Sequence, residues 1–300
     1  MGMMTTRRKK SFLVLELATL AISATLILNY RLFIDYYALY SYKPAPALAA
    51  IENKIDLTDQ ARAMMYEADP VISSKQEFNQ NCAPNQETLE LGCYSKGRIF
   101  ILKIDNQSLA SEMDAVMAHE VLHVAWSRLN SDQRADLTKQ MEAYYKSLSD
   151  PELQDRMASY EKLEPGQVAN ELHSILPTEY SKLPDKLEKY YRQYFKDRQK
   201  VVAAHAKFEK VFSDQHDKLT GQLNQIHELK NQLTVLNDQL EAYKNAGLYA
   251  KYNELIPEQN ARVDEINGLI ETYTQGVDEY NALSKSLNSQ PITQTEKSVK

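Results

Sequence analysis

The 300-residue chain carries a formal net charge of −6, and its basic residues cluster only near the N-terminus. This balance argues against nucleic acid as a partner. The chain holds only two cysteines, which are too few to complete a structural zinc site built on thiolates.

The N-terminus combines a basic cluster with a long apolar run. Residues 1–10 contain Arg7–Lys10, and the nineteen positions 11–29 are mostly apolar, with Glu16 as an interruption near the basic end. As a helix, this run would span about 28 Å, close to the roughly 30 Å hydrocarbon core of a bilayer. Four cations before the run and few after it predict a single-pass transmembrane helix over residues 11–30, with a cytoplasmic N-terminus.

Residues 31–50 are expected to form a juxtamembrane linker on the outer side of the membrane. Tyr30, Phe33, Tyr36 and Tyr37 stand at the start of this stretch, a pattern typical of aromatic belts at bilayer interfaces. A cleaved signal peptide is the alternative, because residues 45–50 offer small side chains. They lie about twenty residues beyond the apolar core, however, which is too far for ordinary processing.

Cys82 and Cys93 lie on the predicted outer side and bracket a short loop that contains Pro, Asn and Gly. Because disulfides persist in oxidising compartments, the spacing predicts a structural disulfide. Closing a loop of about 12 residues stabilises the fold by roughly 3 kcal/mol in the chain-entropy model. A pair of zinc ligands is the alternative, but it would lack further cysteines.

A strand is predicted at Gly97–Ile104, which is rich in β-branched and aromatic residues and is followed by the turn-forming Asp105–Gln107. A helix is expected directly afterwards. Ser108, with Glu112 close behind, resembles a capping signature for its start.

This helix carries the most informative motif of the chain, the pentapeptide His119-Glu120-Val121-Leu122-His123. Positions i and i+4 lie on one face of a helix, so both imidazoles can reach one ion, and Glu120 stands beside the first of them. Two histidines at this spacing with an intervening glutamate are typical of zinc hydrolases. Chance placement and two ordinary half-buried histidines are the competing explanations.

The pentapeptide resembles the zincin superfamily of metallopeptidases, specifically over some 20 residues around His119. The resemblance implies that His119 and His123 bind Zn²⁺ and that Glu120 acts as general base on a zinc-bound water. It also implies that the strand at 97–104 forms the edge along which an extended substrate aligns. The Gly-x-x-His extension of the metzincin branch is missing after His123, so a third ligand must come from another element.

The best candidate for that element is a helix between Pro165-Gly166, which suit a helix start, and Pro177, which marks its end. Glu171 lies on the flank of its apolar stripe, and a carboxylate there needs a partner. The arrangement resembles the gluzincin branch, in which a later glutamate completes the site, and this implies Glu171 as third ligand. The spacing departs from the familiar gluzincin patterns, which leaves His173 and Glu179 as competitors. If Glu171 is the ligand, His173 or Tyr180 is expected to stabilise an oxyanion.

A long helical hairpin is predicted from residue 183 to 288. Apolar residues recur every three or four positions from Leu219 to Tyr243, Asn245–Gly247 offers a helix stop, and a second seam follows to Leu287. Antiparallel pairing of the two helices is expected, with parallel dimerisation as the competing solution. At the base, Tyr190, Tyr191, Tyr194 and Phe195 are expected to pack onto the preceding domain. The three histidines at 205, 216 and 227 are interpreted as surface or seam residues without a carboxylate cluster.

The sequence thus predicts an α+β fold, predominantly α. Its expected parts are a basic N-terminus (1–10), a transmembrane helix (11–30), a linker (31–50), a zincin-like domain with a small sheet (51–182), a coiled-coil hairpin (183–288) and a disordered tail (289–300).

The resulting functional hypothesis is a membrane-anchored zinc metallopeptidase that hydrolyses peptide bonds outside the cytoplasm. Its expected partners are a peptide or protein substrate and the membrane, with a further envelope or cell-wall partner for the hairpin. The alternative is a non-enzymatic envelope scaffold or regulator that acts through the hairpin.

Overall fold

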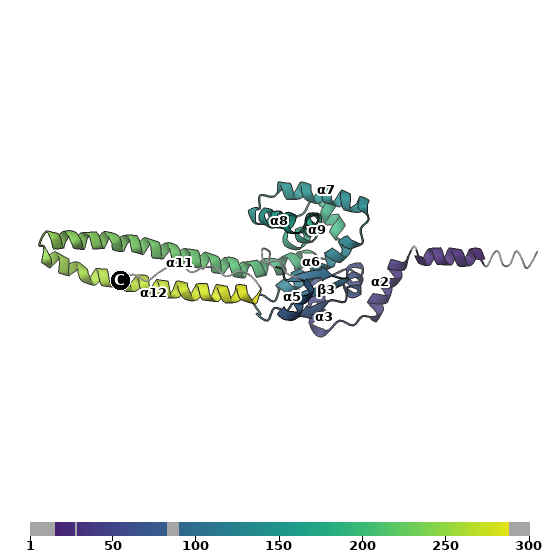
Figure 1. The fold of residues 1–300 in the computed structure, drawn as a ribbon, viewed down its shortest axis with the longest axis horizontal. Coiled ribbons are helices and arrows are strands. Elements are labelled where there is room, and N and C mark those ends of the chain that lie inside the picture. Colours follow the sequence, from purple (N-terminus) through teal and green to yellow (C-terminus); the bar gives the residue numbers. More distant parts are fainter. Residues whose placement is uncertain (1–15, 28, 83–89, 288–300) are drawn as a thin grey trace, which may run out of the picture.

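The computed structural model describes residues 16–27, 29–82 and 90–287. These residues form a mostly helical fold with one small sheet, which confirms the predominantly α type of α+β fold (Figure 1). The shorter helices gather around the sheet, and two long helices extend away from it as an arm. The predicted basic N-terminus, the tail after residue 288 and most of the loop between the cysteines lie outside the described residues.

The sheet has three short strands in the order β1-β3-β2. β3 (Arg98–Leu102) pairs in parallel with β1 (Val71–Ser73) and antiparallel with β2 (Gly92–Ser95). The strand expected at 97–104 is therefore confirmed as β3. It is the central strand, however, so the expectation that it offers a free edge to a substrate is wrong. Among the described strands, the outer position on that side belongs to β2.

The predicted disulfide is confirmed, with an S–S distance of 2.02 Å between Cys82 and Cys93. Cys82 ends α5 (Lys75–Cys82) and Cys93 lies in β2. The bond therefore ties the outer strand of the sheet to the helix beside it.

The motif-bearing helix α6 (Glu112–Ser127) runs through the core of the molecule. It packs against β2, β3, α3 (Pro46–Ile55) and α4 (Asp59–Glu67), and its apolar side chains on several sides are buried, as expected for a central helix. Ser108 does not cap this helix as expected, because its backbone amide and hydroxyl donate to Asn106 inside the preceding turn. The helix begins at Glu112 itself, whose side chain is buried.

Three further helices follow α6 in the chain. α7 (Ser131–Ser147) starts with a capping box at Asn130, and α8 (Pro151–Leu163) is capped by Asp150. α9 (Val168–Glu179) packs along α6, and α7 and α8 pack against α9. The helix expected between Pro165 and Pro177 is thus confirmed as α9. It runs two residues beyond Pro177, which occupies its last turn.

The N-terminal residues form two helices, Glu16–Ile27 and α2 (Tyr30–Ser41). Among the described residues, neither is long and apolar enough by itself to cross a membrane; together they pass that test, but they are bent by 62°. Residues 31–50, expected as a linker, contain α2 and half of α3. Both helices pack on the domain, because Ala38 and Leu48 are buried.

The helix that was expected to run continuously from the domain into the arm is interrupted between residues 191 and 199. A short helix α10 (Asp185–Tyr191) ends before α11 (Gln199–Asn245) begins. The buried guanidinium of Arg198 lies at the break and donates to the carbonyls of Pro177, Tyr180 and Ser181. The aromatic packing predicted here is confirmed, with these side chains buried: Tyr191, Tyr194 and Phe195.

The arm is an antiparallel hairpin of α11 and α12 (Tyr249–Ser286), as predicted (Figure 1). Its seam buries apolar residues of both helices, including Ile226 and Ile266. The turn uses Gly247 at φ 69°, a left-handed conformation that suits glycine. The end of α12 returns to the domain, where Leu287 is fully buried in a cluster with Phe208 and residues of the sheet.

Candidate metal centre

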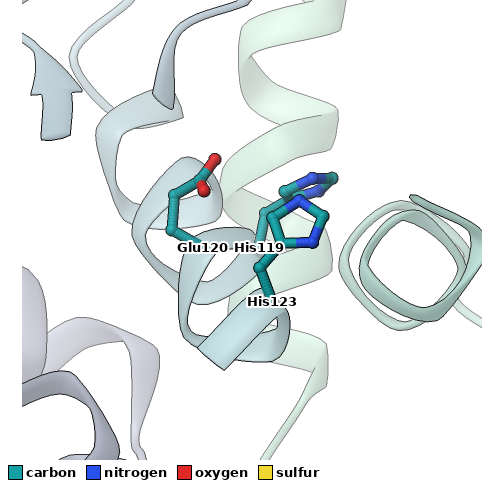
Figure 2. Close-up of side chains that lie close together, drawn as sticks. All are labelled: His119, Glu120 and His123. Carbon is teal, nitrogen blue, oxygen red and sulfur yellow. The ribbon is translucent and has the colours of Figure 1, made fainter. Parts of the chain in front are cut away.

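The centre begins with three side chains of α6. His119 and His123 are one turn apart, and Glu120 leaves the helix beside them (Figure 2). One ligand atom from each of the three lies within 4.8 Å of the others. This group can hold a metal ion.

Glu171 of α9 faces both imidazoles. Its Oε2 lies 3.6 Å from Nε2 of His119, and its Oε1 lies 3.6 Å from Nε2 of His123. Donor atoms bound at 2.0–2.1 Å to one tetrahedral ion lie about 3.3 Å apart. The three side chains therefore surround a space close to the size of a bound ion. The structure thus brings together the three residues expected as ligands.

The neighbours of His123 orient its ring toward this space. Oδ1 of Asn170 lies 3.0 Å from Nδ1 of His123, and the Asn170 amide nitrogen donates to Gln167 at 3.1 Å. Because the amide oxygen faces the ring, Nδ1 carries the proton and Nε2 keeps a free lone pair. Hydrogen bonds of this kind commonly orient metal-binding histidines.

The pKa values of Glu171 and Glu120 are shifted in opposite directions. Burial raises the pKa of Glu171, but the adjacent His123 and His119 outweigh it, so that its pKa is lowered and it stays ionised. Burial raises the pKa of Glu120 to about 8, and Oε2 of Glu120 has no hydrogen-bond partner among the described residues. A carboxyl group with a pKa near neutrality suits proton transfer.

Tyr160 of α8 belongs to the centre and was not anticipated from the sequence. Its hydroxyl interacts with Glu171, and its side chain lines the same cavity as Glu120. No short motif contains Tyr160, and only the packing of α8 against α9 brings it there.

A cavity of about 510 Å³ opens at the centre between α6, β2, α8, α9 and the start of α11. Its described walls carry eight glutamates and a single arginine, Arg156. The cavity therefore favours groups of positive charge. Backbone of the outer strand β2, from Gly92 to Ser95, forms part of the wall.

His205 of α11 corrects the expectation that the histidines of the arm lack carboxylate neighbours. Its Nδ1 lies 3.2 Å from Oε1 of Glu112, and its Nε2 lies 3.7 Å from Oε2 of Glu179. Burial lowers the pKa of His205, but these carboxylates outweigh it and raise that pKa to about 9. The base of the arm is thereby bound to α6 and α9, the two helices that carry the ligand set.

Three other expected site residues are placed differently. His173 is fully buried behind the centre, with Nε2 2.8 Å from the Tyr190 hydroxyl, and burial lowers its pKa to about 3. Tyr180 donates to Asp150 at 2.5 Å. Neither lines the cavity, so the structure does not bring them to the candidate metal centre. Glu179 does line the cavity, but it is paired with Arg156.

No protein-family model, no curated protein and no solved structure matches this chain.

Proposed function

We propose that this protein is a zinc-dependent metallopeptidase. The observation that carries the proposal is the placement of both Glu171 oxygens 3.6 Å from the Nε2 atoms of His119 and His123, with Glu120 beside them at the cavity wall. Two imidazoles and one carboxylate form a catalytic zinc set that leaves a fourth position for water or substrate.

His119, His123 and Glu171 would hold the zinc ion. When bound, zinc would lower the pKa of a coordinated water and polarise the carbonyl of the scissile bond. The residues around it supply the remaining chemistry. Glu120, whose carboxyl has a raised pKa, takes a proton from the attacking water and passes it to the amine nitrogen as the carbon–nitrogen bond breaks. The Tyr160 hydroxyl, which donates to Glu171 and lines the same cavity, would hold that carboxylate in position.

The outer strand β2 suits the binding of an extended substrate. Among the described residues it pairs with β3 along one edge only, and its residues line the cavity. A peptide could add to the free edge through main-chain hydrogen bonds, which demand little of its sequence. The disulfide at Cys93 holds this strand in place and fits an oxidising compartment. We therefore extend the proposal to an enzyme that is held outside the cytoplasm by the N-terminal apolar segment.

The test is the substitution Glu120→Gln. It should retain stoichiometric zinc and lose peptide cleavage, because the amide cannot accept the water proton. Glu161→Gln, at an exposed position of α8 outside the cavity, is the matched control and should retain both. Peptide pools containing lysine suit the assay, since the cavity walls are acidic. Full cleavage by the Glu120→Gln variant would refute the mechanism.

A non-enzymatic scaffold is the second candidate, and the exposed hairpin turn favours it. Leu248 and Tyr249 there are 45% and 63% exposed, as in a contact site for another protein. Metal analysis separates the two candidates. If the purified protein holds no zinc and added zinc does not stabilise it, the scaffold is favoured.

A further inference from the structure

Helix α2 has two faces of different character. The inner face packs on α4 and is fixed by charge, because the guanidinium of Arg128 donates to Asp35 of α2 at 3.1 Å and also to Glu67 of α4. The side chains of Arg128 and Asp35 are only 11% and 18% exposed. Tyr42, just after the helix, stacks on Tyr66 at a ring-centroid distance of 4.6 Å. The helix is therefore a fixed part of the folded domain.

The outer face of α2 is an unusually exposed aromatic stripe. Phe33, Tyr36, Tyr37 and Tyr40 follow the i, i+3, i+4, i+7 spacing of one helix face. Their exposed fractions are 53%, 73%, 70% and 83%. Contiguous exposed apolar surface of this kind marks a site of interaction with a membrane or another protein.

The apolar segment that precedes α2 favours a membrane as the partner of this exposed face. Residues 11–29 form the mostly apolar run, and the helix Glu16–Ile27 within it exposes large apolar side chains, among them Leu17, Leu20 and Ile27. That run ends directly at α2. The bend of 62° between the two helices turns α2 well away from the direction of the first. A helix that leaves an apolar segment at such an angle is suited to lie along a bilayer surface.

The residue types in the stripe also favour a membrane surface as the partner. Three of its four residues are tyrosines, whose rings combine an apolar body with a polar tip and are enriched where lipid meets water. Amphipathic helices of this type bind in the interface plane with their apolar face in the headgroup region.

We propose that α2 lies on the membrane surface, with the stripe Phe33, Tyr36, Tyr37 and Tyr40 in the lipid headgroup region. The contact of Arg128 with Asp35 then holds the folded domain directly on the bilayer. This inference rests on the membrane anchor proposed above and not on the zinc chemistry.

The cysteine content makes a direct test practical. The chain has two cysteines, and both are joined in the disulfide, so a third can be labelled uniquely without reduction. The 300-residue chain carrying Tyr37→Cys or Tyr40→Cys is labelled with a nitroxide and reconstituted in vesicles of phosphatidylcholine and phosphatidylglycerol in equal parts. Lys139→Cys, at an exposed position of α7, is the control. Accessibility to oxygen and to a water-soluble nickel complex is then measured.

We expect accessibility to nickel at positions 37 and 40 to fall by roughly threefold or more relative to position 139, with oxygen accessibility raised, because an interfacial helix buries its apolar face about 5–10 Å into the bilayer. Equal nickel accessibility at all three positions would overturn the proposal. Spin–spin broadening between labels at position 37, with nickel accessibility unchanged by lipid, would also overturn it and assign the stripe to a second copy of the chain. An unchanged melting temperature in each variant verifies that the fold is retained.

Discussion

Nδ1 of His205 lies 3.2 Å from Oε1 of Glu112, and this contact joins the base of the arm to the first turn of α6, the helix of the candidate metal centre. Glu112 stands seven residues before His119, which places the contact about 10 Å from the centre along α6. The arm is thereby attached to the element that presents the ligands.

The contact predicts how stability depends on pH. The pKa of His205 is raised from 6.5 to about 9, so its stabilising contribution is complete below pH 6.5 and is lost as pH rises to about 9. Burial raises the pKa of Glu112 from 4.5 to about 7, so the contribution of Glu112 to stability is also lost as pH rises, over this lower range. In His205→Asn, the loss of unfolding free energy between pH 6.5 and 9 should shrink by about 1–3 kcal/mol. Urea unfolding across this range measures it, and parallel curves for both proteins would contradict the prediction.

The identity of the third ligand can be tested by zinc content. Glu171→Ala should lose bound zinc, because it removes both oxygens that face Nε2 of the histidines. His173→Ala should retain it, because His173 bonds to Tyr190 behind the centre. Zinc analysis after dialysis gives the answer for both variants. Retention of zinc by Glu171→Ala would move the ligand to another residue.

The hydrogen bond from His123 to Asn170 should contribute to metal affinity. Asn170→Ala leaves Nδ1 of His123 without its 3.0 Å partner and should weaken zinc binding about 10–100-fold. Asn170→Asp keeps an oxygen acceptor at the same place and should retain most of the affinity. Competition with a chromophoric chelator measures both constants. Equal affinities for the alanine variant and the wild type would show that the contact has no such role.

Gly92 should be required for the position of the general base. A Cβ at this residue would lie 2.7 Å from Oε1 of Glu120 and would clash with Val116 as well. Gly92→Ala should therefore displace Glu120 and reduce peptide cleavage while zinc is retained. Gly268→Ala, in α12 with open space around it, is the control and should leave cleavage unchanged. Full cleavage by Gly92→Ala would mean that β2 shifts without affecting the centre.

The end of α12 should stabilise the domain. Leu287 is fully buried in a cluster with Phe208, so Leu287→Ala should cost about 2–5 kcal/mol of unfolding free energy. Leu248→Ala, at the exposed turn of the hairpin, should change it by less than about 0.5 kcal/mol. Chemical denaturation compares the two. Equal effects would indicate that α12 does not pack on the domain in solution.

Much of the architecture follows from local patterns in the sequence. Apolar periodicity was sufficient for α9 and the two arm helices, and β-branched residues were sufficient for β3. Glu171 was chosen over His173 and Glu179 through the resemblance to the gluzincin branch and because a carboxylate on the flank of an apolar stripe needs a partner. The structure places it against His119 and His123.

The remainder depended on contacts between distant segments. Tyr160 and His205 belong to no motif, and only the packing of α8 and α11 against α6 and α9 brings them to the cavity. His173 was misplaced because its helix position is marginal, and its orientation depends on Tyr190 from a later segment. The substrate edge was assigned to β3 through the zincin resemblance, and β2, a four-residue strand with little periodic signal, was not predicted.

The arm also has a mechanical consequence. Its first helix has 47 residues, which corresponds to about 70 Å, and its base is bound to α6 and α9 through His205. It extends from the domain on the side away from the N-terminal helices (Figure 1). Because the arm is long, a rotation of only a few degrees at its base displaces the hairpin turn by several ångströms. A force applied at the hairpin turn would therefore act on α6 and α9, the two helices of the candidate metal centre.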